Sequence, residues 1–277
     1  MTMSIRLLAQ LLGDVPLPDA YSPTSYLLAD IQGANPCERT LAMIDVALRR
    51  YPELNEHPCV FLLPEFGLHS VEFDAIYQAL PHTRAVDLFM YGSVALSMAL
   101  NRIQHHLSTS EHVMVVAVTT PLPQNPASVQ SEALCIAHVS PASGTRRVAD
   151  VRHSRWRPYT EGSGPELLAQ QLQRWENVDI THVLNYPLHT RSDAAQFTRF
   201  WYEAPLLSST QLLGKQHCDG ESGAVEQLLR WVELQLMPAS AGHILQLARN
   251  TLGWYSAVLW EHQATEPHHR KGIPVYG

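Results

Sequence analysis

The chain has few cysteines, and they lie far apart. Among its 277 residues there are four, and they are Cys37, Cys59, Cys135 and Cys218. No Cys-x-x-Cys pair occurs, so the spacing supports neither a disulfide framework nor a zinc site. Cys59 and Cys135 lie in apolar, strand-like runs and are expected to be small core residues. This use of cysteine fits a reducing cytoplasm, where we expect the protein to reside.

Other absences exclude further classes of function. The formal net charge is −7 and there is no basic block, which argues against a nucleic-acid partner. No run of 18 apolar residues occurs, so no membrane span is expected. There is no Gly-rich phosphate loop and no Gly-x-Ser-x-Gly motif, and we expect no cofactor. Residues 1–14 carry only Arg6 as a positive side chain, which favours an amphipathic first helix or arm over a signal peptide.

The residues that are present predict a globular α/β protein made of two similar halves. Hydrophobic residues make up 45% of the chain and charged residues 16%, an ordinary globular balance. The first half is expected to contain helices starting at residue 36, after Ser70 and at 92–107, and strands at 25–30, 59–63, 85–89, 113–118 and 133–139. The second is expected to contain helices at 165–175, 192–201 and 221–236, and strands at 148–156, 181–185, within 206–213, and at 243–249 and 256–260.

The two copies of one pattern predict a five-layered α-β-α-β-α architecture. The third helix of each half is apolar on most sides, as a helix between two sheets should be. The continuous apolar run at 113–118 is typical of a strand in a sheet that is covered on both faces. The expected domains are an N-terminal arm at residues 1–24, the halves at 25–143 and 144–262, and a mobile tail at 263–277.

Local signals support the first two helices. Asn35 is placed to cap the first one, and Pro36 suits its first position. In the second helix, Phe73, Ile76 and Leu80 recur at helical spacing and are expected to share one buried face.

One segment resembles a motif of a known enzyme family. Residues 216–229 read Gln-His-Cys-Asp-Gly-Glu-Ser-Gly-Ala-Val-Glu-Gln-Leu-Leu. They are similar to the second catalytic-histidine motif of β-ketoacyl synthases, Gly-His-x-x-Gly-Ala-Ala-Gly-Ala-Val-Glu. Residues 131–137, 180–185 and 252–259 resemble other pieces of that family, in the family's order. The resemblance implies the thiolase fold, with two tandem pseudo-repeats.

The same resemblance implies that the catalytic site is degenerate. Working members of the family place a cysteine nucleophile at the start of the first buried helix, with two histidines beside it. Here the matching nucleophile position falls on Phe89 or Met90, and neither side chain can form an acyl-enzyme. Tyr186, or Pro187 after a slip of one residue, stands at the first histidine's position. Only His217 matches.

Three residues remain as candidates for altered chemistry, each with a plainer alternative. His217 is either a remnant catalytic imidazole or a structural residue at the start of a helix. Cys218 is either a thiolate activated by that helix start or an inert thiol. Ser93 is either a replacement nucleophile or a packing residue. The pairs at residues 105–106 and 268–269 are histidines without ligand spacing, so no metal is expected.

The sequence therefore favours a non-catalytic relative of ketosynthases that works through protein–protein contacts. It would be a scaffold, adaptor or chaperone of a secretion or biosynthetic complex, and its partner would be a second copy, an active ketosynthase or a client protein. The resemblance implies that the strand at residues 85–89 pairs across a dimer axis. Two alternatives stay open: a partner similar to a chain-length factor, and an acyltransferase or hydrolase with rewired residues.

Overall fold

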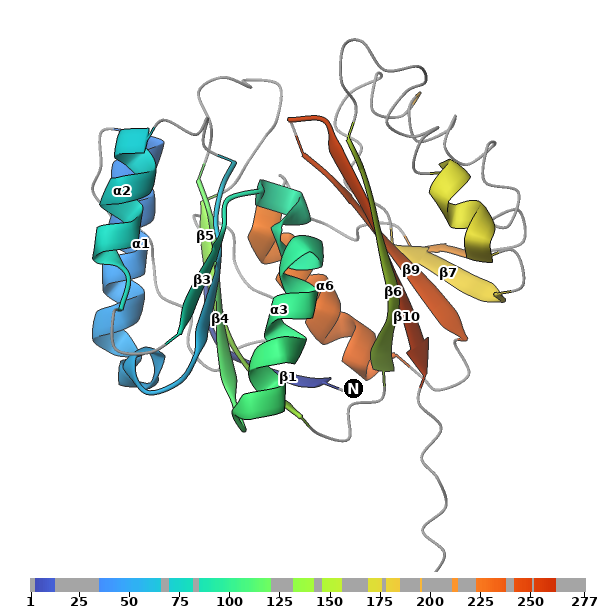
Figure 1. The fold of residues 1–277 in the computed structure, drawn as a ribbon, viewed down its shortest axis with the longest axis horizontal. Helices are drawn as coiled ribbons and strands as arrows, with labels where there is room; N and C mark the ends of the chain where they lie inside the picture. The colour runs from blue at the N-terminus through green and yellow to red at the C-terminus, as the bar shows by residue number, and fades with distance from the viewer. Residues whose placement is uncertain are drawn as a thin grey trace, which may run out of the picture.

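The fold is described from a computed structural model. It describes residues 3–12, 35–65, 70–81, 85–120, 132–141, 146–155, 169–175, 178–184, 195, 211–213, 223–237, 242–250 and 252–262. These residues form two five-stranded sheets with helices between and outside them (Figure 1). No helix in this part of the chain is long and apolar enough to cross a membrane.

The first sheet has the strand order β1-β5-β4-β2-β3. Its strands are β1 (Met3–Leu12), β2 (Cys59–Leu62), β3 (Val86–Phe89), β4 (Val113–Thr119) and β5 (Ala133–Pro141). β2 runs parallel to β3 and β4, whereas β5 is antiparallel to β4 and β1. Every residue of β4 is buried, as the unbroken apolar run predicted for a strand covered on both faces.

The second sheet repeats this topology in the order β6-β10-β9-β7-β8. Its strands are β6 (Arg146–Arg155), β7 (Ile180–Leu184), β8 (Gln211–Leu213), β9 (His243–Arg249) and β10 (Trp254–His262). β7 is parallel to β8 and β9, and β10 is antiparallel to β9 and β6. The chain thus passes from the first sheet to the second between Pro141 and Arg146, and each sheet has two antiparallel and two parallel pairings.

The N-terminal segment is a strand, and the expected amphipathic helix was wrong. β1 pairs with β5 over its length. Met3 and Ile5, two positions apart, are buried, while Arg6 is exposed. A period of two places both apolar side chains on one face of a strand, and β5 supplies hydrogen-bond partners for the backbone of β1. The strand expected at residues 25–30 lies outside the described residues.

Two helices lie between the sheets, as the sequence predicted (Figure 1). They are α3 (Ala95–Thr109), entered through the short 3-10 helix η4 (Gly92–Val94), and α6 (Gly223–Leu236). Both contribute to the largest apolar cluster, which also contains inward-facing residues of both sheets. Burial on both sides explains why α6 has no exposed residue among those described, whereas the second half of α3 carries exposed polar residues such as Asn101 and His105.

The outer faces are covered by the remaining helices. α1 (Pro36–Arg50) and α2 (Ser70–Ala79) pack on the first sheet, and η3 (Pro52–Asn55) follows α1. Asn35 caps α1 as predicted, because its side chain accepts a hydrogen bond from the Glu38 backbone N–H at 2.9 Å. On the second sheet, residues 169–172 are helical and lead into η5 (Gln173–Trp175). Most of the helix expected at 192–201 lies outside the described residues.

The expected buried face of α2 is only partly correct. Ile76 and Leu80 are buried, but Phe73 is 39% exposed and stacks on Tyr77, with ring centroids 6.1 Å apart. Helical spacing places Phe73 near that face, but the face that contacts the sheet is too narrow to cover it.

Candidate functional site

The two central helices begin beside one small cavity. Gly92 precedes α3 with φ +52°, and Gly223 begins α6 with φ +47°. Glycine is favoured in this left-handed region because it has no Cβ. The cavity is lined by Pro64, Glu65, Gly92, Ser93, Thr119, Gly223 and Ala224. The chain therefore brings the ends of β2 and β4 together with the first turns of both central helices.

The backbone approaches its neighbours closely at both glycines. A Cβ on Gly92 would lie 3.3 Å from the Glu65 Oε2 atom, and one on Gly223 would lie 3.1 Å from the Thr119 Oγ1 atom. Both distances are shorter than ordinary van der Waals contact. Each helix start is thus packed against a polar side chain that follows a strand of the first sheet.

Glu65 and Thr119 are cavity residues that the sequence analysis missed. Glu65 is only 6% exposed, and Thr119 is also buried. The first N–H groups of a helix have no partner within the helix and carry partial positive charge. An acidic side chain is favoured near such an end, which accounts for a carboxyl group at this position. The available signal was an acidic residue two positions after the apolar run at 59–63.

The two expected nucleophile positions point into opposite cores. Phe89 ends β3 and packs against the cluster between the sheets. Met90 is 7% exposed and belongs to the cluster on the outer face. The following turn is tied down, because the Gly92 N–H donates to the Leu63 carbonyl at 2.9 Å. Neither side chain is among those that line the cavity.

Ser93 is the candidate that the structure places at the cavity. It lies in η4, is buried, and lines the space together with Glu65. Among the described residues that line this cavity there is no histidine and no cysteine. His217 and Cys218 lie outside the described residues, as do Tyr186 and Pro187, so their predicted roles stay predictions.

A contact between a buried serine and a half-buried histidine occurs one helical turn further along. His153 of β6 lies 3.1 Å from the hydroxyl of Ser97, measured from Nε2 to Oγ. That hydroxyl donates to the Val94 carbonyl at 2.8 Å. Burial lowers the pKa of His153, so the ring is held in its neutral form. His153 thus contacts Ser97 and not the candidate Ser93, and neither His153 nor Ser97 lines the cavity.

The described thiols are not suited to nucleophilic chemistry. Cys37, Cys59 and Cys135 are free and buried. Burial raises the pKa of Cys59 to about 12 and raises the pKa of Cys135 as well. The thiolate is the reactive form of cysteine, and an apolar environment suppresses it. These residues act as core side chains, as the sequence predicted for Cys59 and Cys135.

The space at the helix starts is small. The described residues enclose a cavity of about 10 Å³, roughly the least volume that holds one water molecule. The arrangement offers a hydroxyl, a carboxyl and two helix N-termini. It suits a water or a small polar group.

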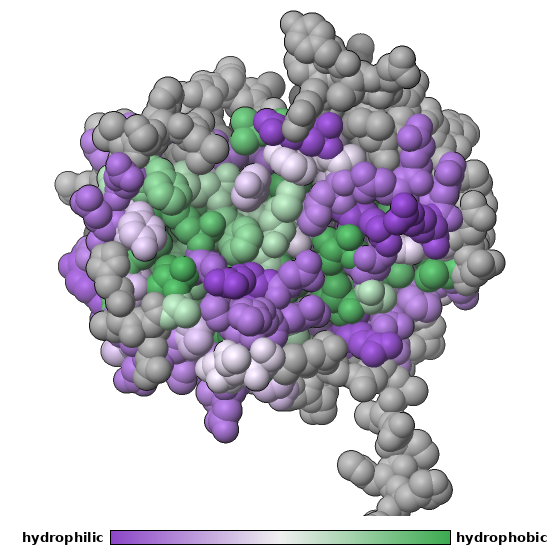
Figure 2. Space-filling model, viewed as in Figure 1, coloured by the Kyte–Doolittle hydropathy of each residue, from purple (hydrophilic) through white to green (hydrophobic). Residues whose placement is uncertain are grey.

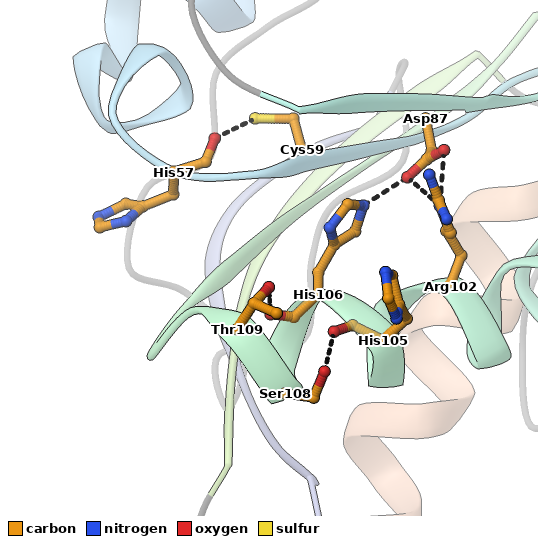
Figure 3. A network of polar contacts seen from close by, with 8 residues as sticks. All are labelled: His57, Cys59, Asp87, Arg102, His105, His106, Ser108 and Thr109. Atoms are coloured by element: carbon orange, nitrogen blue, oxygen red, sulfur yellow. Dashed lines mark hydrogen bonds and ion pairs between the residues drawn. The ribbon is translucent and has the colours of Figure 1, made fainter.

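A second polar network joins β3 to α3 (Figure 3). Asp87 accepts hydrogen bonds from the Nε of Arg102 at 2.8 and 2.9 Å, and it also contacts the Nε2 of His106. His106 is buried, whereas His105 is exposed. No set of three or more His, Cys, Asp or Glu residues in the described part is placed to hold a metal ion.

Comparison with known proteins establishes the fold. No protein-family model matches the sequence, and no curated protein matches it in sequence. The ketosynthase from module 6 of the Bacillus subtilis 168 bacillaene synthase superposes with a TM-score of 0.58 at 10% identity, over 83% of this chain and 60% of that chain. OleA from Xanthomonas campestris gives 0.52 at 11% identity, over 83% and 82%. AbyA1, a tetronic acid condensing enzyme, gives 0.52 at 15% identity, over 85% and 89%. The chain has a thiolase-like α/β fold.

Proposed function

We propose that this chain is a non-catalytic protein of the thiolase-like fold that acts through contacts with other proteins, as a scaffold, adaptor or chaperone. The observation that carries the proposal is the set of side chains at the start of the first central helix. Phe89 and Met90 stand where the resemblance to ketosynthases expects a nucleophile. Phe89 is half-buried against one apolar cluster, and Met90 is buried in the other. An acyl-enzyme needs a side chain that can lose a proton and attack a carbonyl.

The cavity itself also supports a lost activity. Acyl transfer needs donors aimed at the oxygen that becomes negative in the transition state. The two helix starts are suited to that task, but Glu65 places a carboxyl group among them. A carboxylate there competes with a developing oxyanion for the same positive ends. The site is better suited to holding its own side chain than to stabilising a substrate.

The edge strand β3 supports the role in protein contacts. β3 is an edge strand of the first sheet among the described residues, and each of its four residues is half-buried. In Figure 2, apolar side chains gather over the part of this face where β3 and the start of α3 lie in Figure 1. A strand edge with an apolar surface is a template for pairing with another strand. We propose that a second copy of the chain pairs there.

A second candidate function rests on Ser93. Ser93 lines the cavity. The alternative is therefore an acyltransferase or hydrolase that uses the Ser93 hydroxyl together with His217 or Cys218. A partner similar to a chain-length factor is the other alternative. It would use the same strand edge to pair with a cysteine-bearing ketosynthase.

Intact mass after incubation with acyl-CoA separates the enzyme from the non-catalytic protein. We expect no covalent adduct on the full chain under conditions in which a cysteine-bearing ketosynthase is acylated. An adduct that disappears in Ser93→Ala or Cys218→Ala would replace the proposal with the rewired enzyme.

Sedimentation velocity of the purified chain tests the partner. We expect a species of twice the 31.0 kDa chain mass. A chain that stays monomeric at all concentrations would overturn self-pairing, and a stable complex with a purified ketosynthase would then favour the chain-length-factor alternative.

A further inference from the structure

Three histidines lie close together on the outer face of the first sheet, at the end opposite the cavity. They belong to three consecutive strands of the sheet or to the residues just before them, and we call them the histidine row. His57 lies just before β2, His112 just before β4, and His138 within β5. His138 is opposite Met114, which is opposite Cys59. His112 and His57 lie two positions before Met114 and Cys59, and the three ring centroids form a compact triangle. The ring centroids are 5.5 Å apart for His57 and His112, 4.4 Å for His112 and His138, and 6.5 Å for His57 and His138.

A fixed positive charge continues this row. Arg6 of β1 is directly opposite His138 in the antiparallel register. β1 is the outermost strand of the sheet, and it has β5 as its neighbour among the described strands. Met3 and Ile5 of the same strand are buried in the cluster between the sheets. The row therefore ends on a strand that is held from one side and carries part of the core.

No carboxylate forms an ion pair with these groups among the described residues. Elsewhere, Asp87 contacts His106, and Glu261 lies 3.7 Å from His243, whereas the three rings of the row have no described ion-pair partner. The Nδ1 atom of His112 is buried and has no hydrogen-bond partner in this part of the chain.

The environment of His138 opposes its protonation. Burial lowers its pKa, and His112, Arg6 and His57 lower it further. The groups that lower this pKa come from β1 and from the segments before β2 and β4. The exposed residues Glu56 and Glu111 directly precede His57 and His112 in the chain. At neutral pH the folded protein therefore holds His138 neutral.

Metal binding was the first alternative to consider. Imidazoles are common ligands of zinc, but no three described His, Cys, Asp or Glu side chains are placed to hold a metal ion. Proton binding is the chemistry that the arrangement supports.

We propose that this row makes the attachment of β1 to the first sheet sensitive to acid. Protonation of His138 places one cation directly opposite Arg6 and beside the ring of His112. Like charges that face each other on neighbouring strands repel, and β1 is the strand that can leave, because it ends the sheet. Its departure exposes Met3 and Ile5 and opens the edge of β5 to another chain.

The sign of the effect follows from proton linkage. A detached β1 relieves His138 of Arg6, so the detached state binds a proton more readily than the attached state. The state that binds more protons gains as the pH falls. Detachment is therefore favoured as the pH drops below about 6.5, the ordinary pKa of histidine.

Amide hydrogen exchange of the full chain at pH 7.5 and 5.5 tests the proposal. Exchange is corrected for the pH dependence of the intrinsic rate, and the protection of β1 is expressed relative to that of β4. We expect this ratio to fall about 1.4-fold to fivefold on acidification, the factor that corresponds to the usual energies of cross-strand side-chain pairs. His138→Gln and Arg6→Gln should each abolish the fall, whereas His105→Gln, which changes an exposed histidine outside the row, should retain it.

Three outcomes would overturn the proposal. One is an unchanged ratio in the unaltered protein, and another is a full response in His138→Gln. If His138→Gln does not fold, Arg6→Gln decides alone, because Arg6 is exposed. The third is a rise in β1 protection on addition of zinc that His138→Gln removes, which would make the row a metal site.

Discussion

Asp87 connects an edge strand to a central helix through charge. Its carboxylate receives both an Arg102 donor and a buried His106 ring. The carboxylate is 20% exposed and the arginine 49% exposed, so the arginine remains partly in water. A half-buried charge that holds two partners contributes more than an isolated surface pair.

We predict that Asp87→Asn lowers the free energy of unfolding by about 1–3 kcal/mol, because it removes the charged acceptor of two groups. Urea denaturation measures the change. Asp45→Asn is the matched control, since Asp45 and Arg49 form an i,i+4 pair in which both side chains are more than half exposed. Such a pair is worth about 0.3–0.5 kcal/mol. Equal losses in the two variants would contradict the role of the Asp87 network.

Substitution of Gly92 tests whether backbone conformation or side-chain crowding determines the cost of adding a Cβ in the turn before α3. Gly92→Ala is predicted to cost about 1–2 kcal/mol, the cost of a left-handed backbone for a residue with a Cβ. Gly242→Ala is the control: its Cβ would lie 3.1 Å from a Thr181 methyl, but its φ is not in the left-handed region. Thermal or urea unfolding should show the smaller loss in Gly242→Ala. A larger loss there would mean that crowding, and not φ, decides.

At the scale of elements, the hydrogen bonds of β3 determine which backbone groups remain for a partner. The Cys59 N–H donates to the Ala85 carbonyl at 3.0 Å, and the Leu63 N–H donates to the Phe89 carbonyl at 2.9 Å. In a parallel ladder, alternate residues of one strand bond to the same neighbour. Residues 85, 87 and 89 therefore face β2, and the N–H groups of Val86 and Leu88 face the outer edge.

Val86→Pro should accordingly abolish self-association and leave the fold in place. Proline removes one outward N–H and is tolerated on an edge strand. Sedimentation velocity should show a monomer, with circular dichroism unchanged. Tyr77→Ala, on the most exposed large apolar residue that the structure describes, should leave the dimer intact. If Tyr77→Ala loses the dimer and Val86→Pro does not, the interface lies on α2 and not on β3.

At the scale of the whole molecule, half-buried histidines make stability depend on pH. Burial lowers the pKa of His153, so the unfolded chain binds a proton at a higher pH than the folded chain does. Stability is therefore complete above the ordinary histidine pKa of about 6.5 and decreases as the pH falls below it. His138 acts in the same direction.

We predict that the unaltered protein is less stable to urea at pH 5.5 than at pH 7.5, and that His153→Gln removes part of this difference. His105→Gln serves as the control, because that side chain is exposed. An identical pH dependence in His153→Gln and the unaltered protein would show that the pKa of this ring does not differ between the folded and unfolded states.

The periodic elements were predictable from the sequence. The apolar run at 113–118 became the buried strand β4, and Asn35 capped α1. Both signals are local, since side-chain alternation and capping depend on residues within a few positions of one another. β1 was not predictable in this way, because its backbone partner is β5, more than a hundred residues along the chain.

The site was only partly predictable. The resemblance located the start of α3 and drew attention to Phe89, Met90 and Ser93, and of these the structure places Ser93 at the cavity. Glu65 and Thr119 were missed because they belong to different strands. Only the order of strands in the sheet brings the ends of β2 and β4 to the starts of both central helices.

The sequence alone determined the α/β class, the repeated pattern and the two apolar central helices, since each follows from composition and short-range periodicity. Only the tertiary structure determined which residues from different elements are in contact. It places Glu65 at a helix start, Asp87 between Arg102 and His106, and Arg6 opposite His138. These contacts join residues from separate strands and helices, and a side chain's chemistry depends on the groups that surround it.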